Sequence, residues 1–152
     1  EIDVKILDEL QKNASIPLSE LSKKVGLSNT PCWNRIKKLE EDKVILSKTV
    51  VLDNKKINLP ITVFLSISIQ NHSEKWLTNF ERVVKKYDEI TEVHRLTGTN
   101  SDYQITILSP SIDEYDKFQQ NLIKEIECTY MSSHISLQVI KKNHKLPLTY
   151  VN

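Results

Sequence analysis

Residues 28–42, SNTPCWNRIKKLEED, distribute their charge unevenly. Arg35, Lys37 and Lys38 come before any acidic residue, and small polar residues stand in front of them. Arginine and lysine side chains neutralise the phosphates of DNA, while small polar side chains can reach the edges of bases. This stretch is therefore a candidate for binding double-stranded DNA. A basic helix face that is simply solvated is the structural alternative, and the helices around it favour DNA binding.

The spacing of the same residues predicts a helix that Ser28 caps. Pro31 falls in the first turn, where its missing N–H removes no intrahelical hydrogen bond. Cys32, Ile36 and Leu39 recur at the helical period and form the buried stripe. A recognition helix presents its N-terminal turns to the major groove. The candidate DNA-binding residues are Ser28, Asn29, Thr30, Pro31, Trp33, Asn34, Arg35, Lys37 and Lys38.

Two further helices precede this one. Apolar residues at the helical period predict a helix over residues 3–14 and a second from Pro17 to Val25, which Gly26 ends. Residues 43–53 are β-branched and suit two short strands. Three helices with a glycine turn before the third, followed by a small hairpin, predict a winged helix-turn-helix domain over residues 1–53, with residues 54–60 as a linker.

The second half of the chain changes its period. Residues 61–69, ITVFLSISI, alternate apolar and polar side chains, as a half-buried strand does. Helices are expected over residues 77–87 and from Ser111 onward, and strands over 92–97, 102–108 and 134–140. The order βαββαβ is the ferredoxin-like arrangement. The fold class is therefore α+β, with a second domain over residues 61–152.

Composition excludes several classes of protein. The 152 residues are 39% hydrophobic and 27% charged, with a formal net charge of +1, which is typical of a globular protein. An apolar run long enough to cross a membrane is missing, and the two cysteines form no CxxC pair. The histidines are scattered, and motifs for acyl transfer or nucleotide chemistry are absent. We expect no enzyme, no metal, no cofactor, no membrane partner and a cytoplasmic location.

The chain has a second glycine in LTGTNSDYQI, between two expected strands. Gly98 permits a backbone conformation whose free amides can hold a carboxylate. A β-turn that needs its glycine for geometry alone is the structural alternative.

The block LSKKVGLSNTPCWNRIKKLEEDKVI resembles the helix-turn-helix of the Lrp/AsnC family of transcription regulators. The ending VIKKNHKLPL is similar to that of the family, and the βαββαβ half resembles its amino-acid-sensing domain. Lys43 departs from the pattern, since the family usually has glycine there. The resemblance implies sequence-specific DNA binding modulated by a free amino acid, such as leucine or methionine. It also implies homodimers that assemble to tetramers or octamers.

The resemblance also implies an effector site. The family carries a G-D-x-D-Y pattern in this loop, which Gly98, Asp102 and Tyr103 match. Thr99 replaces the first acid, and this chain has one more residue before Asp102. Ser132 and Ser133 stand where the family often has hydroxyl residues facing the ligand. The implied effector-binding residues are Gly98, Thr99, Asn100, Asp102, Tyr103, Ser132 and Ser133.

Two other functions remain open. One is an architectural protein that coats DNA with little sequence preference and no ligand. The other is an amino-acid-binding module whose helical half no longer binds DNA. Affinity for specific and scrambled DNA separates the three interpretations.

Overall fold

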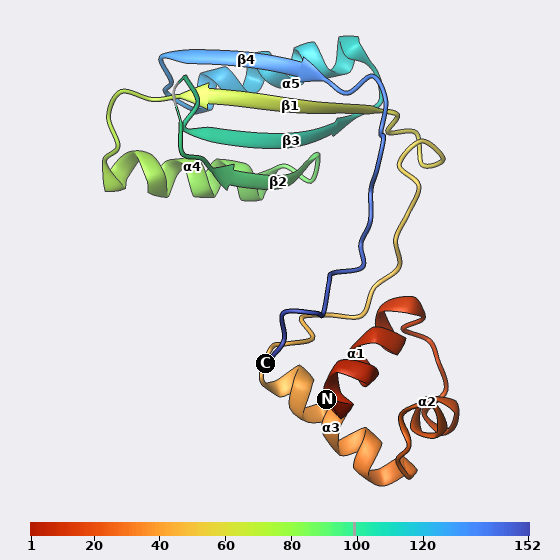
Figure 1. The fold of residues 1–152 in the computed structure, drawn as a ribbon. Helices are drawn as coiled ribbons and strands as arrows, with labels where there is room; N and C mark the ends of the chain where they lie inside the picture. Colours follow the sequence, from red (N-terminus) through yellow and green to blue (C-terminus); the bar gives the residue numbers. More distant parts are fainter. Residues whose placement is uncertain (99) are drawn as a thin grey trace. The chain divides into compact units, whose positions relative to one another are not determined.

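The computed structural model describes residues 1–98 and 100–152, and these divide into two compact units (Figure 1). The first unit joins Glu1–Val51 to Ile140–Asn152, and the second is Leu52–Val139. The sequence predicted a second domain over residues 61–152, so the placement of Ile140–Asn152 in the first unit differs from that prediction.

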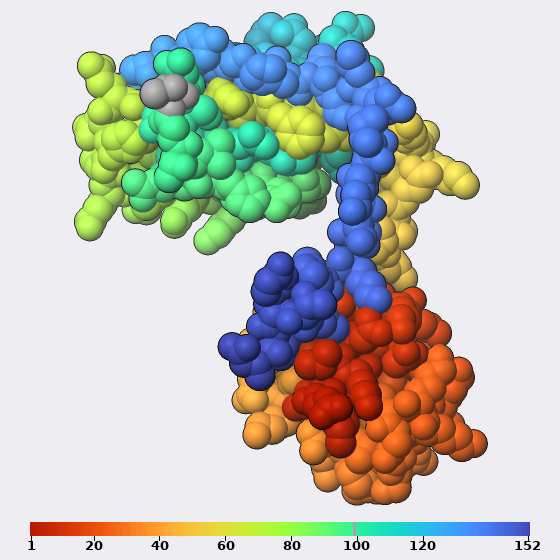
Figure 2. All heavy atoms as spheres, in the orientation of Figure 1, coloured from red at the N-terminus to blue at the C-terminus, as the bar shows by residue number. Residues whose placement is uncertain are grey.

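The C-terminal residues belong to the first unit because they bind its first helix. The Gln11 side chain donates to Leu146 O at 3.0 Å and accepts from Leu146 N at 2.7 Å. Lys145 Nζ lies 2.7 Å from an Asp8 carboxylate oxygen. Figure 2 shows the tail, in dark blue, packed over the red N-terminal residues.

The first unit contains the three expected helices, α1 (Ile2–Lys12), α2 (Leu18–Val25) and α3 (Asn29–Glu41). Each contributes an apolar stripe to one core. The buried side chains of this core are Ile6, Leu21, Val25, Cys32, Ile36 and Leu39. The stripe predicted for the third helix is thus the one that is buried.

A tight turn joins α2 to α3. Gly26 has φ +77°, a conformation that side chains with a Cβ disfavour. Leu27 N donates to Ser22 O at 2.9 Å and closes the end of α2. The glycine therefore fixes where α3 starts, as the sequence predicted.

The two short strands expected over residues 43–53 are wrong, because the structure forms no strand there. A strand requires a partner for its backbone hydrogen bonds. The apolar side chains of the segment are exposed, with Leu46 82% and Val50 77% accessible. The segment has strand propensity, but the described residues of the chain provide no partner strand for it.

The second unit is a four-stranded antiparallel sheet with two helices, in the predicted βαββαβ order (Figure 1). The strand order is β2-β3-β1-β4. The elements are β1 (Ile61–Ser68), α4 (Glu74–Lys86), β2 (Ile90–Arg95), β3 (Tyr103–Ser109), α5 (Ile112–Glu125) and β4 (Tyr130–Ile135).

Side chains alternate between the faces of the sheet. Val63, Leu65 and Ile67 of β1 are fully buried in a core that includes Phe80 of α4 and Leu122 of α5. Both helices therefore cover the same face. The opposite face carries the alternate residues of each strand, and neither helix covers it.

The last strand differs in position from the prediction of residues 134–140. β4 ends at Ile135, which pairs with Val63, and Ser136 N donates to Thr62 O at 2.9 Å. β1 begins at Ile61, one residue beyond this contact, so it can pair with little of the chain after Ser136. Leu137 and Ile140 are consequently exposed, at 96% and 84%.

Candidate nucleic-acid interface and ligand cavity

The exposed face of α3 carries the residues that the sequence proposed for DNA binding. Thr30, Asn34, Lys37 and Lys38 are all exposed, whereas Cys32, Ile36 and Leu39 are buried beneath them. Ser28 caps the helix through its backbone but makes no side-chain cap hydrogen bond. The first amides of α3 and the Ser28 hydroxyl can therefore bind an anion such as a phosphate.

The cations of α3 differ in their partners. Within residues 1–98 and 100–152, Lys38 makes no ion pair, so its charge faces solvent. Lys37 lies 3.4 Å from Glu40, and its Nζ is 5.5 Å from the centre of the Trp33 ring. Arg35 lies at the side of the face and contacts Asp3 of α1 at 3.0 Å. Arg35 can bind a phosphate only by giving up part of that contact.

Asn29 has a structural bond that the sequence did not reveal. Its Oδ1 accepts a hydrogen bond of 2.7 Å from the buried hydroxyl of Ser22 on α2. This bond braces the angle between α2 and α3, while the Asn29 amide nitrogen remains available. Ser22 sits at a stripe position of α2 between Leu21 and Val25, and that polar residue in an apolar stripe was the available signal.

Cys32 is a packing residue. Its side chain is fully buried in the first core, and burial raises the pKa of its thiol. A thiol with a raised pKa stays protonated and unreactive at neutral pH.

The glycine loop of the second unit is built around Asp102. Gly98 has φ +128° and Asn100 has φ +66°, while Thr99 lies outside the described residues. Asp102 Oδ2 accepts from Ile69 N at 2.8 Å, and His72 Nε2 lies 3.8 Å from Oδ1. One carboxylate oxygen thus holds the end of β1. The other lies beside His72 but makes no hydrogen bond within the described residues, so it can accept one from a ligand.

A cavity of about 610 Å³ lies at this loop. Its lining residues are Ser68, Asn100, Ser101, Asp102, Thr129 and Tyr130. Two residues predicted for effector binding, Asn100 and Asp102, thus line one cavity. The other lining residues were not predicted: Ser68, Ser101, Thr129 and Tyr130. Ser68 and Thr129 stand at the ends of neighbouring strands, and the sequence does not show which strand ends meet.

Three other predicted effector residues, Tyr103, Ser132 and Ser133, do not line this cavity. Tyr103 is buried on the helix side, with its ring 4.9 Å from that of Phe80. Ser132 and Ser133 are neighbours on β4 and point to opposite faces. Ser133 Oγ lies 2.5 Å from Tyr115 OH on the helix side. A ligand on one face of the sheet cannot contact both serines.

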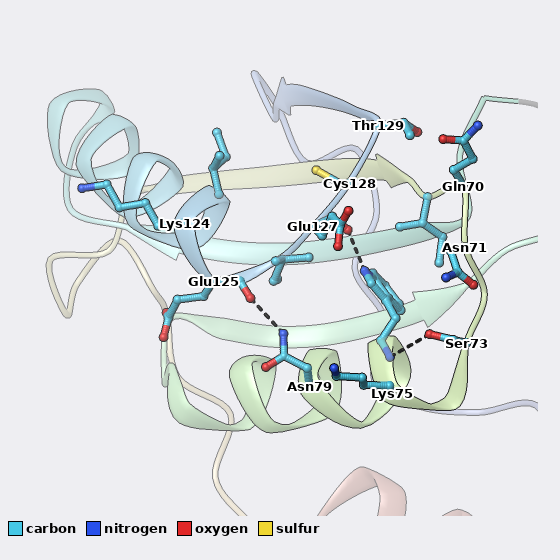
Figure 3. A pocket seen from close by; sticks show the side chains of 14 residues that line it. Gln70, Asn71, Ser73, Lys75, Asn79, Lys124, Glu125, Glu127, Cys128 and Thr129 are labelled. Carbon is cyan, nitrogen blue, oxygen red and sulfur yellow. Dashed lines mark hydrogen bonds between the residues drawn. The ribbon is translucent and has the colours of Figure 1, made fainter.

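A second hollow, of about 830 Å³, lies between the start of α4 and the end of α5 (Figure 3). Here Trp76 Nε1 donates to Glu127 O at 2.6 Å, and Asn79 Nδ2 donates to Glu125 O at 2.9 Å. Both side chains hold the turn after α5 against α4. Because these donors are occupied, we interpret Trp76 and Asn79 as structural residues that hold α4 against the end of α5, and not as ligand contacts.

Within residues 1–98 and 100–152, no group of histidine, cysteine, aspartate or glutamate side chains could hold a metal ion. Among the same residues, no helix combines the length and the apolar character needed to cross a membrane.

Comparison with known families assigns each half of the chain. Residues 1–45 match the family described as winged helix-turn-helix DNA-binding, and residues 62–146 match the Lrp/AsnC ligand binding domain. The expected fold class is thereby confirmed.

The relatives are regulators of transcription. The chain is 41% identical over 148 residues to a glutamate uptake regulatory protein of Zymomonas mobilis, covering 97% of this chain and 90% of that protein. It is 33% identical to the DNA-binding transcriptional activator DecR of Escherichia coli, with 97% of both covered.

Two solved structures share the fold. An AsnC family transcriptional regulator from Agrobacterium tumefaciens is 41% identical, with a TM-score of 0.94 over 100% of this chain and 99% of that one. A transcriptional regulator from Neisseria meningitidis, solved in complex with L-Met, is 28% identical with a TM-score of 0.92, over 100% and 98% of the two chains. The chain therefore belongs to the Lrp/AsnC family of DNA-binding transcription regulators.

Proposed function

We propose that α3 reads a specific DNA sequence and that a free amino acid, bound at the Asp102 cavity, controls the regulator. The observation that carries the DNA assignment is the exposed, acid-free start of α3. There Thr30 and Asn34 share a face with Lys37 and Lys38. The two small polar side chains are placed to contact bases, and the lysines to contact phosphates.

The effector assignment is supported by the charge of the cavity. Asp102 Oδ1 can hold the ammonium group of an amino acid, because Oδ2 is already engaged by Ile69 N. Backbone amides of the loop around Gly98 can hold the carboxylate. The Neisseria relative solved with L-Met supports an amino acid as the class of effector. Gly98 and Asn100 contribute to binding the effector carboxylate through the positive φ angles that they adopt in the loop.

A homodimer completes the unit that binds DNA. The open face of the sheet carries Phe64 and Leu108, and Leu46, Val50 and Leu137 are exposed. A second copy of the chain would cover these apolar groups. A two-fold dimer presents two α3 helices to half-sites about one helical turn apart. Dimers assemble further, to tetramers or octamers. A regulator of this kind acts on the genome and so works in the cytoplasm.

DNA titrations test the specific reading of DNA. Mobility shifts should give a higher affinity for the upstream region of the protein's own gene than for a scrambled sequence of the same length. Thr30→Ala and Asn34→Ala should reduce this preference, because each loses contacts that depend on sequence. Equal affinity for both DNAs would favour the architectural alternative. Absence of DNA binding would favour the ligand-binding module.

A thermal-shift panel of the twenty amino acids tests sensing. An amino acid at about 100 times its dissociation constant stabilises the folded state by about 2.7 kcal/mol. We expect at least one class of amino acid to raise Tm by several degrees. A panel without any shift would contradict the effector assignment and leave the DNA assignment intact.

A further inference from the structure

We propose that the Ser68 hydroxyl is a hydrogen-bonding contact for the effector. We also propose that the cavity selects an amino acid with a polar, uncharged side chain over an apolar one of the same size. This inference rests on the proposed sensing of an amino acid and names the chemical class that is sensed.

Ser68 is the last residue of β1 and lines the Asp102 cavity. Its Oγ is buried and has no hydrogen-bond partner within residues 1–98 and 100–152. The carbonyl of the same residue is engaged, since Ser68 O accepts from Thr129 N at 2.9 Å and from Thr129 Oγ1 at 3.0 Å. The strand end is thus fixed while its hydroxyl is left free.

A buried hydroxyl without a partner destabilises a protein, so its position calls for a partner from outside. Rotation about χ1 turns a serine hydroxyl between staggered positions with little change elsewhere. Ser68 lines the cavity, and the proposed contact requires such a rotation to turn the buried Oγ toward the bound molecule. The ligand supplies the missing hydrogen bond, and the unliganded protein is less stable because it lacks that bond.

The rest of the lining has the same character. Asn100, Ser101, Thr129 and Tyr130 add amide and hydroxyl groups to the carboxylate of Asp102. The Thr129 and Ser101 hydroxyls already donate to backbone carbonyls, so the group that an apolar side chain would leave unpaired is the buried Ser68 hydroxyl. Sites built for hydrogen bonding reject a ligand that leaves such a group unpaired. An acidic side chain would approach Asp102, and the described lining includes no lysine or arginine to offset that repulsion. A polar, uncharged side chain meets neither penalty.

Calorimetric titration of the full chain with amino-acid pairs of matched shape tests this selection. The pairs are threonine with valine, asparagine with leucine, and glutamine with methionine. In the pair that fits the cavity, the polar member should bind at least about tenfold more tightly.

Ser68→Ala should move that ratio toward one. It should also raise Tm of the unliganded protein, because the unpaired hydroxyl is gone. Thr78→Ala, which removes an exposed hydroxyl on α4 away from the cavity, is the control for binding and should leave the ratio unchanged.

The outcomes separate this inference from the proposal on which it rests. Apolar members that bind as tightly as their polar counterparts would overturn the selection and leave amino-acid sensing intact. An unchanged ratio in Ser68→Ala would overturn the role of the hydroxyl. If neither these six amino acids nor any other binds, sensing itself fails, and the inference fails with it.

Discussion

Lys38 offers a quantitative test of the DNA interface. Its side chain is exposed at the middle of the α3 face and makes no ion pair within the described part of the chain. Each phosphate contact contributes about 0.9 to the slope of log affinity against log salt. A dimer carries two copies of Lys38, so Lys38→Ala should reduce that slope by about 1.8.

The slope converts into a measurable ratio. Between about 50 and about 200 mM salt, a slope difference of about 1.8 corresponds to a roughly twelvefold difference in how far affinity falls. Wild type should therefore lose about twelve times more affinity than Lys38→Ala over this range. Lys37→Ala should give a smaller change, because Glu40 already neutralises part of its charge at 3.4 Å.

Fluorescence anisotropy with labelled duplex DNA at four or more salt concentrations provides the slopes. Lys85→Ala is the matched control, since it removes an exposed lysine from α4 in the other unit. The reasoning is refuted if Lys38→Ala and wild type give the same slope while Lys85→Ala behaves as wild type.

Three further predictions concern the stability of the first unit. Lys43 has φ +59°, a conformation that is strained for a residue with a Cβ. Lys43→Gly should therefore stabilise the protein by about 0.5–1 kcal/mol in denaturant titration, whereas Lys43→Ala should not. A lower stability for the glycine variant would contradict this. Hydrogen bonds from Lys12 and Lys145 hold the pKa of Asp8 at about 2, below its ordinary 3.8. The ionised Asp8 therefore stabilises the folded protein above pH 3.8, and this stabilisation is lost as pH falls through about 2. In an NMR titration, Lys145→Ala should raise the pKa of Asp8, and an unchanged value would show that the tail does not bind α1. Leu21 is 1% exposed, and Leu21→Ala should cost about 2–5 kcal/mol by urea unfolding, a loss below about 1 kcal/mol being inconsistent with a tightly packed core.

Periodic signals in the sequence predicted the fold well. Cys32, Ile36 and Leu39 are buried at helical spacing, and Val63 and Leu65 are buried at strand spacing. Such patterns are local, because one face of each element must leave water. The glycine turn before α3 was predictable for the same reason, since Gly26 needs no distant partner to adopt its conformation.

Features that depend on distant partners were not predictable. Residues 43–53 have strand propensity, yet pairing requires a second strand that the chain does not place there. The contact of Arg35 with Asp3 depends on how α1 crosses α3, which periodicity does not specify. The opposite orientation of Ser132 and Ser133, by contrast, follows from strand alternation and could have been read from the sequence.

The proposed control means that amino-acid binding at the Asp102 cavity changes the affinity of α3 for DNA. One titration measures this coupling. Anisotropy should be recorded for duplex DNA from the gene's own upstream region, with and without each amino acid at saturating concentration. We predict that at least one amino acid changes the DNA dissociation constant by about 5- to 150-fold, and that the same amino acid raises Tm of the free protein. Tight, specific DNA binding that no amino acid alters, in any assembly state, would contradict control by an amino acid.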